Sequence, residues 1–230
     1  MSIAVIFDVD GTLVDIFDVD GTLVDSVDAH AEAWHRVLAE FGHDVPVERT
    51  RAQIGKGGDE LMKEFLSPQE IEQNGEAIDK RRSEMFKADY LENVQPFPGV
   101  RALFERLLAE GHKLALGTSG NENDVAHYKK LLGIEDLNLV QTTSQDAERS
   151  KPHPDIFQAA LDKLGVEAGE AVAVGDTPYD AIAAVKAGMG AVGVLCGGFP
   201  VDDLRGAGCM ALFDGPADLL ARYAGSPLDR

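Results

Sequence analysis

The sequence has little cysteine and no long apolar stretch, and each shortage excludes a class of protein. Only Cys196 and Cys209 occur in 230 residues, without a CxxC pair or a Cys/His cluster, so neither a disulfide framework nor a zinc site is indicated. No run approaches the roughly 18 apolar residues that span a bilayer, and the sequence lacks a signal-peptide pattern at its start. We therefore expect a cytoplasmic protein that does not bind membranes.

Basic residues are also scarce. The chain has 21 Lys and Arg against 40 Asp and Glu, which gives a formal net charge of −19. Such a charge repels phosphate backbones, so we expect no binding to nucleic acids or to anionic membranes. An anionic substrate would need a local cation. With 44% hydrophobic residues, a chain of this length can bury a full core and suggests one domain plus a smaller insert.

A ten-residue segment occurs twice in succession. IFDVDGTLVD runs from Ile6 to Asp15, and the same ten residues run from Ile16 to Asp25. The unit is too short for a solenoid repeat and has no third copy, so we interpret it as a local duplication.

Helical patterns dominate residues 26–93. Ala31, Trp34, Val37 and Leu38 recur at helical spacing, and Gly42 is placed to end this helix. Charged amphipathic segments continue to residue 93, interrupted by a glycine-rich stretch at 54–61, IGKGGDEL. We predict an all-helical domain over residues 28–94.

Strands and helices alternate after residue 95. Pro96 and Pro98 prevent helix continuation there. Apolar runs at 113–117, 171–175 and 191–195 predict short buried strands, and helical patterns precede or follow them at 100–108, 154–164 and 180–187. This alternation predicts an α/β fold with a doubly wound parallel sheet, a Rossmann-like core formed by residues 1–27 and 95–230. Ligands of such sheets bind beyond the carboxyl ends of the strands.

Polar clusters adjoin these predicted strand ends. They are the duplicated Asp-Val-Asp-Gly-Thr, the Thr118 to Asn121 cluster, Ser150-Lys151-Pro152, and the segment from Gly175 to Asp180. The two aspartates of DxD project to the same face of a strand. A third carboxylate, at Asp176 or Asp180, completes an oxygen-rich set suited to Mg²⁺.

This set of residue types fits phosphoryl transfer. One aspartate can attack phosphorus, while its neighbour two residues on protonates the leaving alkoxide and later activates water. Lys151 and the Thr118 hydroxyl would neutralise and orient the transferring group.

In these four motifs the chain resembles the haloacid dehalogenase superfamily, specifically its phosphatases with a small helical cap. DVDGTLVDS at 18–26 is similar to the first motif, Thr118 to the second, Lys151 to the third, and Asp176 with Asp180 to the fourth. The resemblance implies that the first Asp is the nucleophile, the +2 Asp the general acid/base, and Asp176 an outer Mg²⁺ ligand. It also disfavours dehalogenation, because the dehalogenases of this superfamily lack the +2 aspartate.

The duplication leaves two possible nucleophiles. Upstream residues favour the first copy, Asp8 and Asp10, because the strand before Asp18 would contain Asp15, and an unpaired buried carboxylate costs a few kcal/mol. This cost is avoided if the pKa of Asp15 rises or a partner is found; His112 shows no partner signal in the sequence. Downstream residues favour the second copy, which runs straight into the predicted cap helix. We expect Asp18 and Asp20 to act as catalytic residues. The same two residues and Asp176 are the expected metal ligands, supported by Asp180. Asp8 and Asp10 would replace Asp18 and Asp20 in the alternative register.

Substrate recognition is assigned to loops around this site. In the family geometry the cap loop would bring Lys56 and Gly57 to the substrate, and Ser119 and Gly120 follow Thr118. His30 lies at a spacing where related sugar-phosphate mutases carry a cap histidine. The glycine-rich cap loop at 54–61 is similar to those of phosphoglycolate-type phosphatases.

We therefore predict a Mg²⁺-dependent phosphatase of a small phosphorylated metabolite, such as phosphoglycolate or a sugar phosphate, acting as a monomer or homodimer. Two alternatives stay open. One is a β-phosphoglucomutase-like phosphomutase; the other is a non-catalytic phosphate-binding protein, if the duplication disrupts the site.

Overall fold

A parallel sheet of six strands forms the centre of the structure, a computed structural model that describes residues 14–118, 122–137 and 139–229. Across the sheet the strands are β5 (Val140–Thr142), β4 (Lys113–Gly117), β1 (Val14–Phe17), β6 (Ala171–Gly175), β7 (Gly190–Val194) and β8 (Ala211–Phe213). All neighbouring pairs are parallel, so the carboxyl ends of these strands lie at one edge. The predicted α/β sheet is confirmed.

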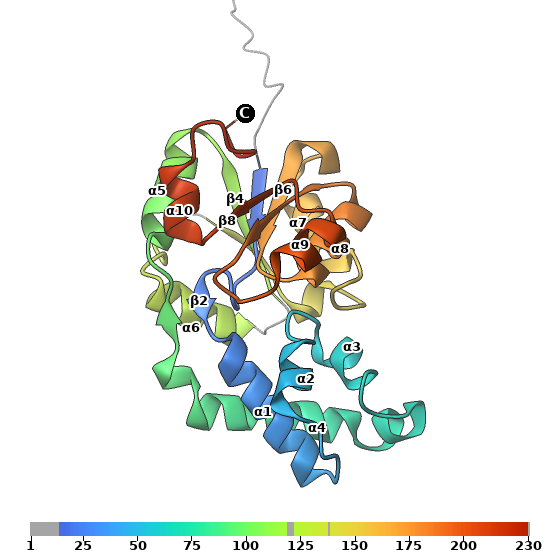
Figure 1. Ribbon diagram of the computed structural model, residues 1–230. Helices are drawn as coiled ribbons and strands as arrows, with labels where there is room; N and C mark the ends of the chain where they lie inside the picture. The colour runs from blue at the N-terminus through green and yellow to red at the C-terminus, as the bar shows by residue number, and fades with distance from the viewer. Residues whose placement is uncertain (1–13, 119–121, 138, 230) are drawn as a thin grey trace, which may run out of the picture.

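Helices cover the two faces of the sheet (Figure 1). On one face lie α5 (Val100–Ala109), α6 (Glu122–Leu131) and α10 (Pro216–Ala221); on the other lie α7 (Asp155–Leu164) and α8 (Pro178–Ala187), with α9 (Val201–Ala207) packed on α8. Short 3₁₀ turns occur at Leu91–Asn93, Ser144–Asp146 and Ala168–Glu170. The strands therefore carry apolar side chains on both faces, as buried parallel strands do.

The central strand β1 spans the junction of the two copies of the duplicated segment: Val14 and Asp15 end the first copy, and Ile16 and Phe17 begin the second, so the strand leads to Asp18. It pairs with β4 on one side and β6 on the other, and all four of its residues are buried. Val14 and Ile16 pack on the α7 side of the sheet, while Phe17 packs on the opposite side, 4.7 Å from Phe104 between ring centroids. Asp8 and Asp10 of the first copy lie outside the described residues.

Asp15 is accommodated in this strand by a buried histidine. Its carboxylate accepts a hydrogen bond from His112 Nδ1 at 2.5 Å, and both side chains are fully buried. The other ring nitrogen lies 3.2 Å from the Tyr223 hydroxyl, which also donates to the Leu228 carbonyl. The sequence shows no signal of this pairing, because the two residues are 97 positions apart.

A helical unit lies beyond the carboxyl edge of the sheet (Figure 1). It consists of α1 (Val27–Glu40), α2 (Val47–Arg51), α3 (Gly58–Met62) and α4 (Pro68–Asp89). Helix α1 packs against α2 and α4 with the predicted face, including Trp34 and Val37, buried. Helix α4 begins at a capping box in which Ser67 and Glu70 exchange hydrogen bonds.

The two connections between sheet and helical unit run side by side. Strand β2 (Val24–Asp25) pairs antiparallel with β3 (Gln95–Pro96), and the Phe97 N–H donates to the Leu23 carbonyl. The prolines after residue 95 therefore do more than end a helix, because one of them lies in this short ribbon. No helix in the described part of the chain has the length and apolar character needed to cross a membrane.

Candidate active site

Asp18 directly follows the central strand and lies at its carboxyl end. The backbone N–H of Asp18 donates to the Val174 carbonyl of β6, which continues the sheet pairing to this residue. The side chain is 6% exposed. Because the neighbouring strands end at the same edge, the polar residues after β4 and β6 and before α7 converge here, as their positions in the sequence predict.

Lys151 lies between two carboxylates at the centre of this cluster. Its Nζ is 2.7 Å from Asp18 Oδ1 and 2.7 Å from Asp180 Oδ1, and all three side chains are buried. Burial alone would lower the pKa of Lys151, but the negative charges of Asp18 and Asp180 raise it above its ordinary value. Lys151 therefore carries a positive charge beside Asp18.

Asp180 orients this lysine and also takes part in the N-terminal cap of helix α8. Its second oxygen, Oδ2, accepts hydrogen bonds from the Thr177 backbone N–H at 3.0 Å and the Thr177 hydroxyl at 2.6 Å, which completes a capping box. Pro178 occupies the first turn of the helix. The carboxylate is thus held rigidly on both oxygens, and its position fixes that of the Lys151 ammonium group.

Three carboxylates come close enough to share a cation. Oxygens of Asp18, Asp176 and Asp180 all lie within 4.8 Å of one another. Burial raises the pKa of Asp18 to about 7 although Lys151 opposes this, and burial with the charges of Asp180 and Asp18 raises the pKa of Asp176 well above its ordinary value. Burial and the like charges of neighbouring carboxylates act in the same direction here, and the charge of Lys151 offsets only part of their effect.

Asp176 supplies the sharpest test of whether a metal ion fits. Its Oδ1 accepts from the Thr22 hydroxyl at 3.0 Å, whereas its buried Oδ2 has no hydrogen-bond partner among the described residues. A Cβ placed at Gly21 or at Gly197 would collide with Oδ2, so the absence of side chains there makes room for it. An unsatisfied carboxylate oxygen in such a cradle suits a hard cation.

The grouped carboxylates differ from the predicted metal set in one member. The sequence suggests Asp18, Asp20 and Asp176, with Asp180 in support, whereas the side-chain cluster contains Asp180 and not Asp20. The reason is that the Asp20 carboxylate is bound elsewhere.

Three donors hold the Asp20 carboxylate two residues beyond Asp18. Its Oδ1 lies 2.6 Å from the Ser26 hydroxyl, 3.2 Å from His30 Nε2 and 3.1 Å from the Tyr128 hydroxyl. Burial alone would raise the pKa of Asp20, but the charge of His30 and these hydrogen bonds lower it to about 2. Tyr128 has no sequence pattern that identifies it, because it lies 108 residues away on α6.

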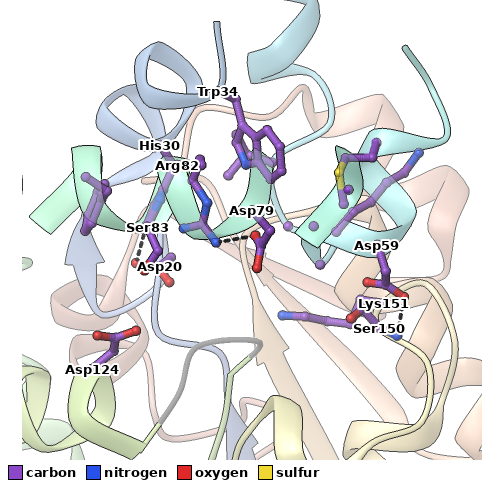
Figure 2. Close-up of a pocket in the computed structure, with 18 of the residues that line it drawn as sticks. Asp20, His30, Trp34, Asp59, Asp79, Arg82, Ser83, Asp124, Ser150 and Lys151 are labelled. Atoms are coloured by element: carbon purple, nitrogen blue, oxygen red, sulfur yellow. Dashed lines mark hydrogen bonds and ion pairs between the residues drawn. The ribbon is translucent and has the colours of Figure 1, made fainter. Parts of the chain in front are cut away.

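A pocket of about 700 Å³ opens between the sheet edge and the helical unit (Figure 2). Asp18, Asp20 and Lys151 line it from the sheet side, and His30 from α1. The His30 ring stacks on Phe86 of α4, with 3.8 Å between ring centroids.

The other predicted site residues have different surroundings. Lys56 and Gly57 line the pocket, and Lys56 Nζ donates to Gln53 and Glu64, each at 2.6 Å. Thr118 is buried directly after β4, and its N–H donates to the Thr142 carbonyl. The predicted contacts of Ser119 and Gly120 cannot be placed, since both lie outside the described residues.

Direct contacts join the helical unit to the loops of the sheet edge. The Tyr179 hydroxyl donates to the Ala52 carbonyl at 2.7 Å, and the guanidinium group of Arg51 donates to the Gly197 carbonyl at 2.9 Å. The cap loop approaches so closely that a Cβ at Gly55 or Gly57 would clash with side chains of the sheet-edge loops. These glycines, two of those in IGKGGDEL, permit the close approach.

Comparison with known proteins agrees with this geometry. The sequence profile of the haloacid dehalogenase-like hydrolases matches residues 16–194. The chain belongs to this family. Among its haloacid dehalogenase-like relatives is a phosphoglycolate phosphatase of Rhodospirillum rubrum, 31% identical over 228 residues, which cover 95% of this chain and 90% of the relative.

Two further haloacid dehalogenase-like proteins extend the comparison. A phosphorylated carbohydrates phosphatase of Thermotoga maritima is 29% identical over 186 residues, 81% of this chain and 82% of the relative. The crystal structure of a hydrolase from Pseudomonas syringae superposes with a TM-score of 0.85 and 27% identity, covering 94% of this chain and 99% of that one. The superfamily, the fold and a phosphatase activity, each predicted from the sequence motifs, are thereby confirmed.

Proposed function

We propose that the protein hydrolyses the phosphate monoester of a small metabolite, phosphoglycolate or a sugar phosphate, through a phosphorylated aspartate. The observation that carries this proposal is the position of Lys151, 2.7 Å from Asp18 and 2.7 Å from Asp180 at the base of the pocket. A buried cation beside a carboxylate at a strand end suits the binding of a phosphoryl group next to a nucleophile. The substrates named for the relatives support this substrate class.

Asp18 is the proposed nucleophile. Its oxygen attacks phosphorus, the bond from phosphorus to the ester oxygen breaks, and the phosphoryl group is transferred to Asp18. Lys151 and the Thr118 hydroxyl bind the phosphoryl oxygens and stabilise their charge in the transition state. Asp180 contributes indirectly by holding Lys151 in place.

Asp20 is the proposed general acid and base. Together with His30, 3.2 Å away, it supplies the proton that the leaving alkoxide takes. In the second half of the reaction it accepts a proton from water, whose oxygen attacks phosphorus and releases phosphate from Asp18. The low pKa of Asp20 favours its role as the base. For Asp20 to act first as the acid, closure around substrate must weaken some of its three hydrogen bonds.

The proposed cofactor is Mg²⁺, held by Asp18 and Asp176, with its charge offsetting that of the phosphate. The unsatisfied Asp176 Oδ2 and the mutual proximity of the carboxylates support this assignment. Asp180 is less suited to ligate the ion, because both of its oxygens already accept hydrogen bonds.

We assign different roles to the two parts of the chain. Residues 1–27 and 95–230 form the catalytic core, and the helical domain over 28–94 closes the pocket and selects the substrate. Lys56 and Gly57 of its loop, with His30, are the proposed recognition residues, because all three line the pocket.

Release of phosphate from p-nitrophenyl phosphate with and without Mg²⁺ tests the proposed activity. We expect turnover that requires Mg²⁺ and is abolished in Asp18→Asn. Absence of turnover in a folded sample would favour a non-catalytic phosphate-binding protein. The mutase alternative, which the His30–Asp20 contact favours, predicts an isomerised sugar phosphate in place of free phosphate.

A further inference from the structure

The wall that α4 contributes to the pocket carries an arginine that the proposed chemistry does not use. Arg82 extends from α4 into the pocket, and in Figure 2 its guanidinium group lies between Asp20 and Asp79. Lys151 lines the same pocket from the sheet side, so the pocket has a cation on each of two walls.

Arg82 is held in position but keeps most of its donors. Its guanidinium carbon lies 5.3 Å from the centre of the Trp34 ring, and its side chain is only 21% exposed. The Nε atom is buried and has no hydrogen-bond partner in the part of the chain that the structure describes. Because Nε has no exposed surface, an anion in the pocket would be bound through the terminal nitrogens of the guanidinium group.

One terminal nitrogen of Arg82 donates to Asp79 Oδ1 at 3.0 Å. Asp79 lies one helical turn earlier on α4, and its side chain is half exposed. A partly exposed ion pair between residues one helical turn apart contributes little stability, so it orients the arginine without saturating its donors. A guanidinium group has five N–H donors in a planar fork, which leaves donors for a bidentate contact with an anion.

The lysines of the helical unit that line the pocket are each paired with a carboxylate at a shorter distance than that between Arg82 and Asp79. Each ammonium group lies close to a carboxylate: Lys56 to Glu64 at 2.6 Å, Lys63 to Glu60 at 2.6 Å and Lys87 to Asp124 at 2.8 Å. Several other carboxylates face the same space. With a net charge of −19 on the chain, an anionic ligand group needs a cation with free donors, and Arg82 meets this need.

We propose that Arg82 is a specificity-determining residue that binds an anionic group at the far end of the substrate, a carboxylate or a second phosphate. This inference rests on the proposed function, which places the reacting phosphate at Asp18. The pocket volume of about 700 Å³ is within the range of about 300–1,000 Å³ typical of sites for drug-sized ligands. It leaves room for a chain of several carbons between the two ends.

Ligand binding to Asp18→Asn protein, measured by calorimetry with Mg²⁺, tests the inference without turnover. Three six-carbon ligands differ only at the end remote from one phosphate: hexitol 6-phosphate ends in a hydroxyl, 6-phosphogluconate in a carboxylate, and hexitol 1,6-bisphosphate in a phosphate. We expect one or both anionic ligands to bind at least about tenfold tighter than hexitol 6-phosphate, as a bidentate charged contact allows. Whichever is preferred identifies the group that Arg82 takes.

Substitution of Arg82 decides whether this preference belongs to the arginine. Arg82→Gln should reduce it to within about twofold while leaving the Kd for hexitol 6-phosphate unchanged, and Arg82→Lys should keep part of it. Arg82→Met keeps the apolar stem on Trp34 and should behave like Arg82→Gln. Lys63→Gln, which removes a paired cation from the same pocket, is the matched control and should leave the preference intact.

Three results would overturn the inference. They are a preference that survives Arg82→Gln, an equal loss for all three ligands, and the absence of any preference in the parent protein. Failure of the proposed function would look different: wild-type protein would show the Arg82-dependent preference but release no phosphate from p-nitrophenyl phosphate.

Discussion

Replacing His112 with leucine should strongly destabilise the protein, because it removes a hydrogen bond to a carboxylate in the middle of the sheet. Asp15 and His112 are both fully buried and lie 2.5 Å apart. Removing one partner of a buried hydrogen-bonded pair that includes a carboxylate typically costs about 3–5 kcal/mol. For a domain of 150–250 residues, each kcal/mol lowers Tm by about 2–4 °C, so we expect a decrease of roughly 6–20 °C.

A second substitution should reverse most of this loss. The first copy of the duplicated segment is preceded by Val5 at the position that Asp15 occupies before the second copy, so Asp15→Val supplies the apolar residue of an ordinary buried strand. Replacing a buried polar pair with well-packed apolar residues is often neutral or stabilising. We expect the Asp15→Val/His112→Leu double variant to lie within about 1 kcal/mol of wild type, a coupling of at least about 2 kcal/mol.

Urea unfolding followed by circular dichroism measures the free energy of unfolding of the wild type, the two single variants and the double variant, which together form a double-mutant cycle. His43→Leu is the control, because His43 makes only a partly exposed contact with Glu70 at 3.4 Å and should change stability by at most about 1 kcal/mol. Additive effects of the Asp15 and His112 substitutions would refute the reasoning, since they would show that the two side chains do not stabilise each other.

Three further predictions concern the site. In a colorimetric phosphate assay, Asp18→Asn should abolish phosphate release, whereas Asp8→Asn should leave it within about twofold. The reverse pattern would assign catalysis to the first copy. Lys151→Met should lower kcat by at least about 10³-fold and Asp180→Asn by about 10–100-fold, because the first loses the cation and the second only its orientation; equal losses in steady-state kinetics would contradict this distinction. In metal-free protein, burial raises the pKa of Asp18 to about 7. The folded state therefore holds a proton that the unfolded chain releases near pH ~4. Stability should fall as pH rises between these values, by at most about 4 kcal/mol. Thermal melts in EDTA should show this decline in wild type and a weaker one in Asp18→Asn, and parallel profiles would exclude Asp18 as its source.

The long, continuous apolar runs were sufficient to predict much of the sheet. Strands at 113–117 and 171–175 have the predicted bounds, and β7 differs by one residue at each end. Strands β5 and β8 were missed because each has three residues, of which two are only partly buried. The β2–β3 ribbon was missed because two-residue strands have no periodicity.

The candidate site was predictable where it depends on strand ends, and not where it depends on distant partners. Asp18, Lys151 and Asp180 converge because parallel strands end at one edge, which follows from the order of elements. The contacts of Asp15 with His112 and of Asp20 with Tyr128 join residues about a hundred positions apart. Such pairings depend on how helices pack on the sheet, and local sequence patterns do not report this packing.

The pairing of Val24–Asp25 with Gln95–Pro96 brings together the two points where the chain leaves and re-enters the core. Paired strands lie about 5 Å apart, a gap that a two-residue β-turn can close. The intervening residues could therefore be exchanged for a longer, shorter or differently folded insert while both ends of the core strands stay in place. Transplanting the insert would test its proposed part in substrate selectivity while Asp18, Lys151 and Asp180 stay on the scaffold, and the new insert would have to supply again the donors that Ser26 and His30 give to Asp20.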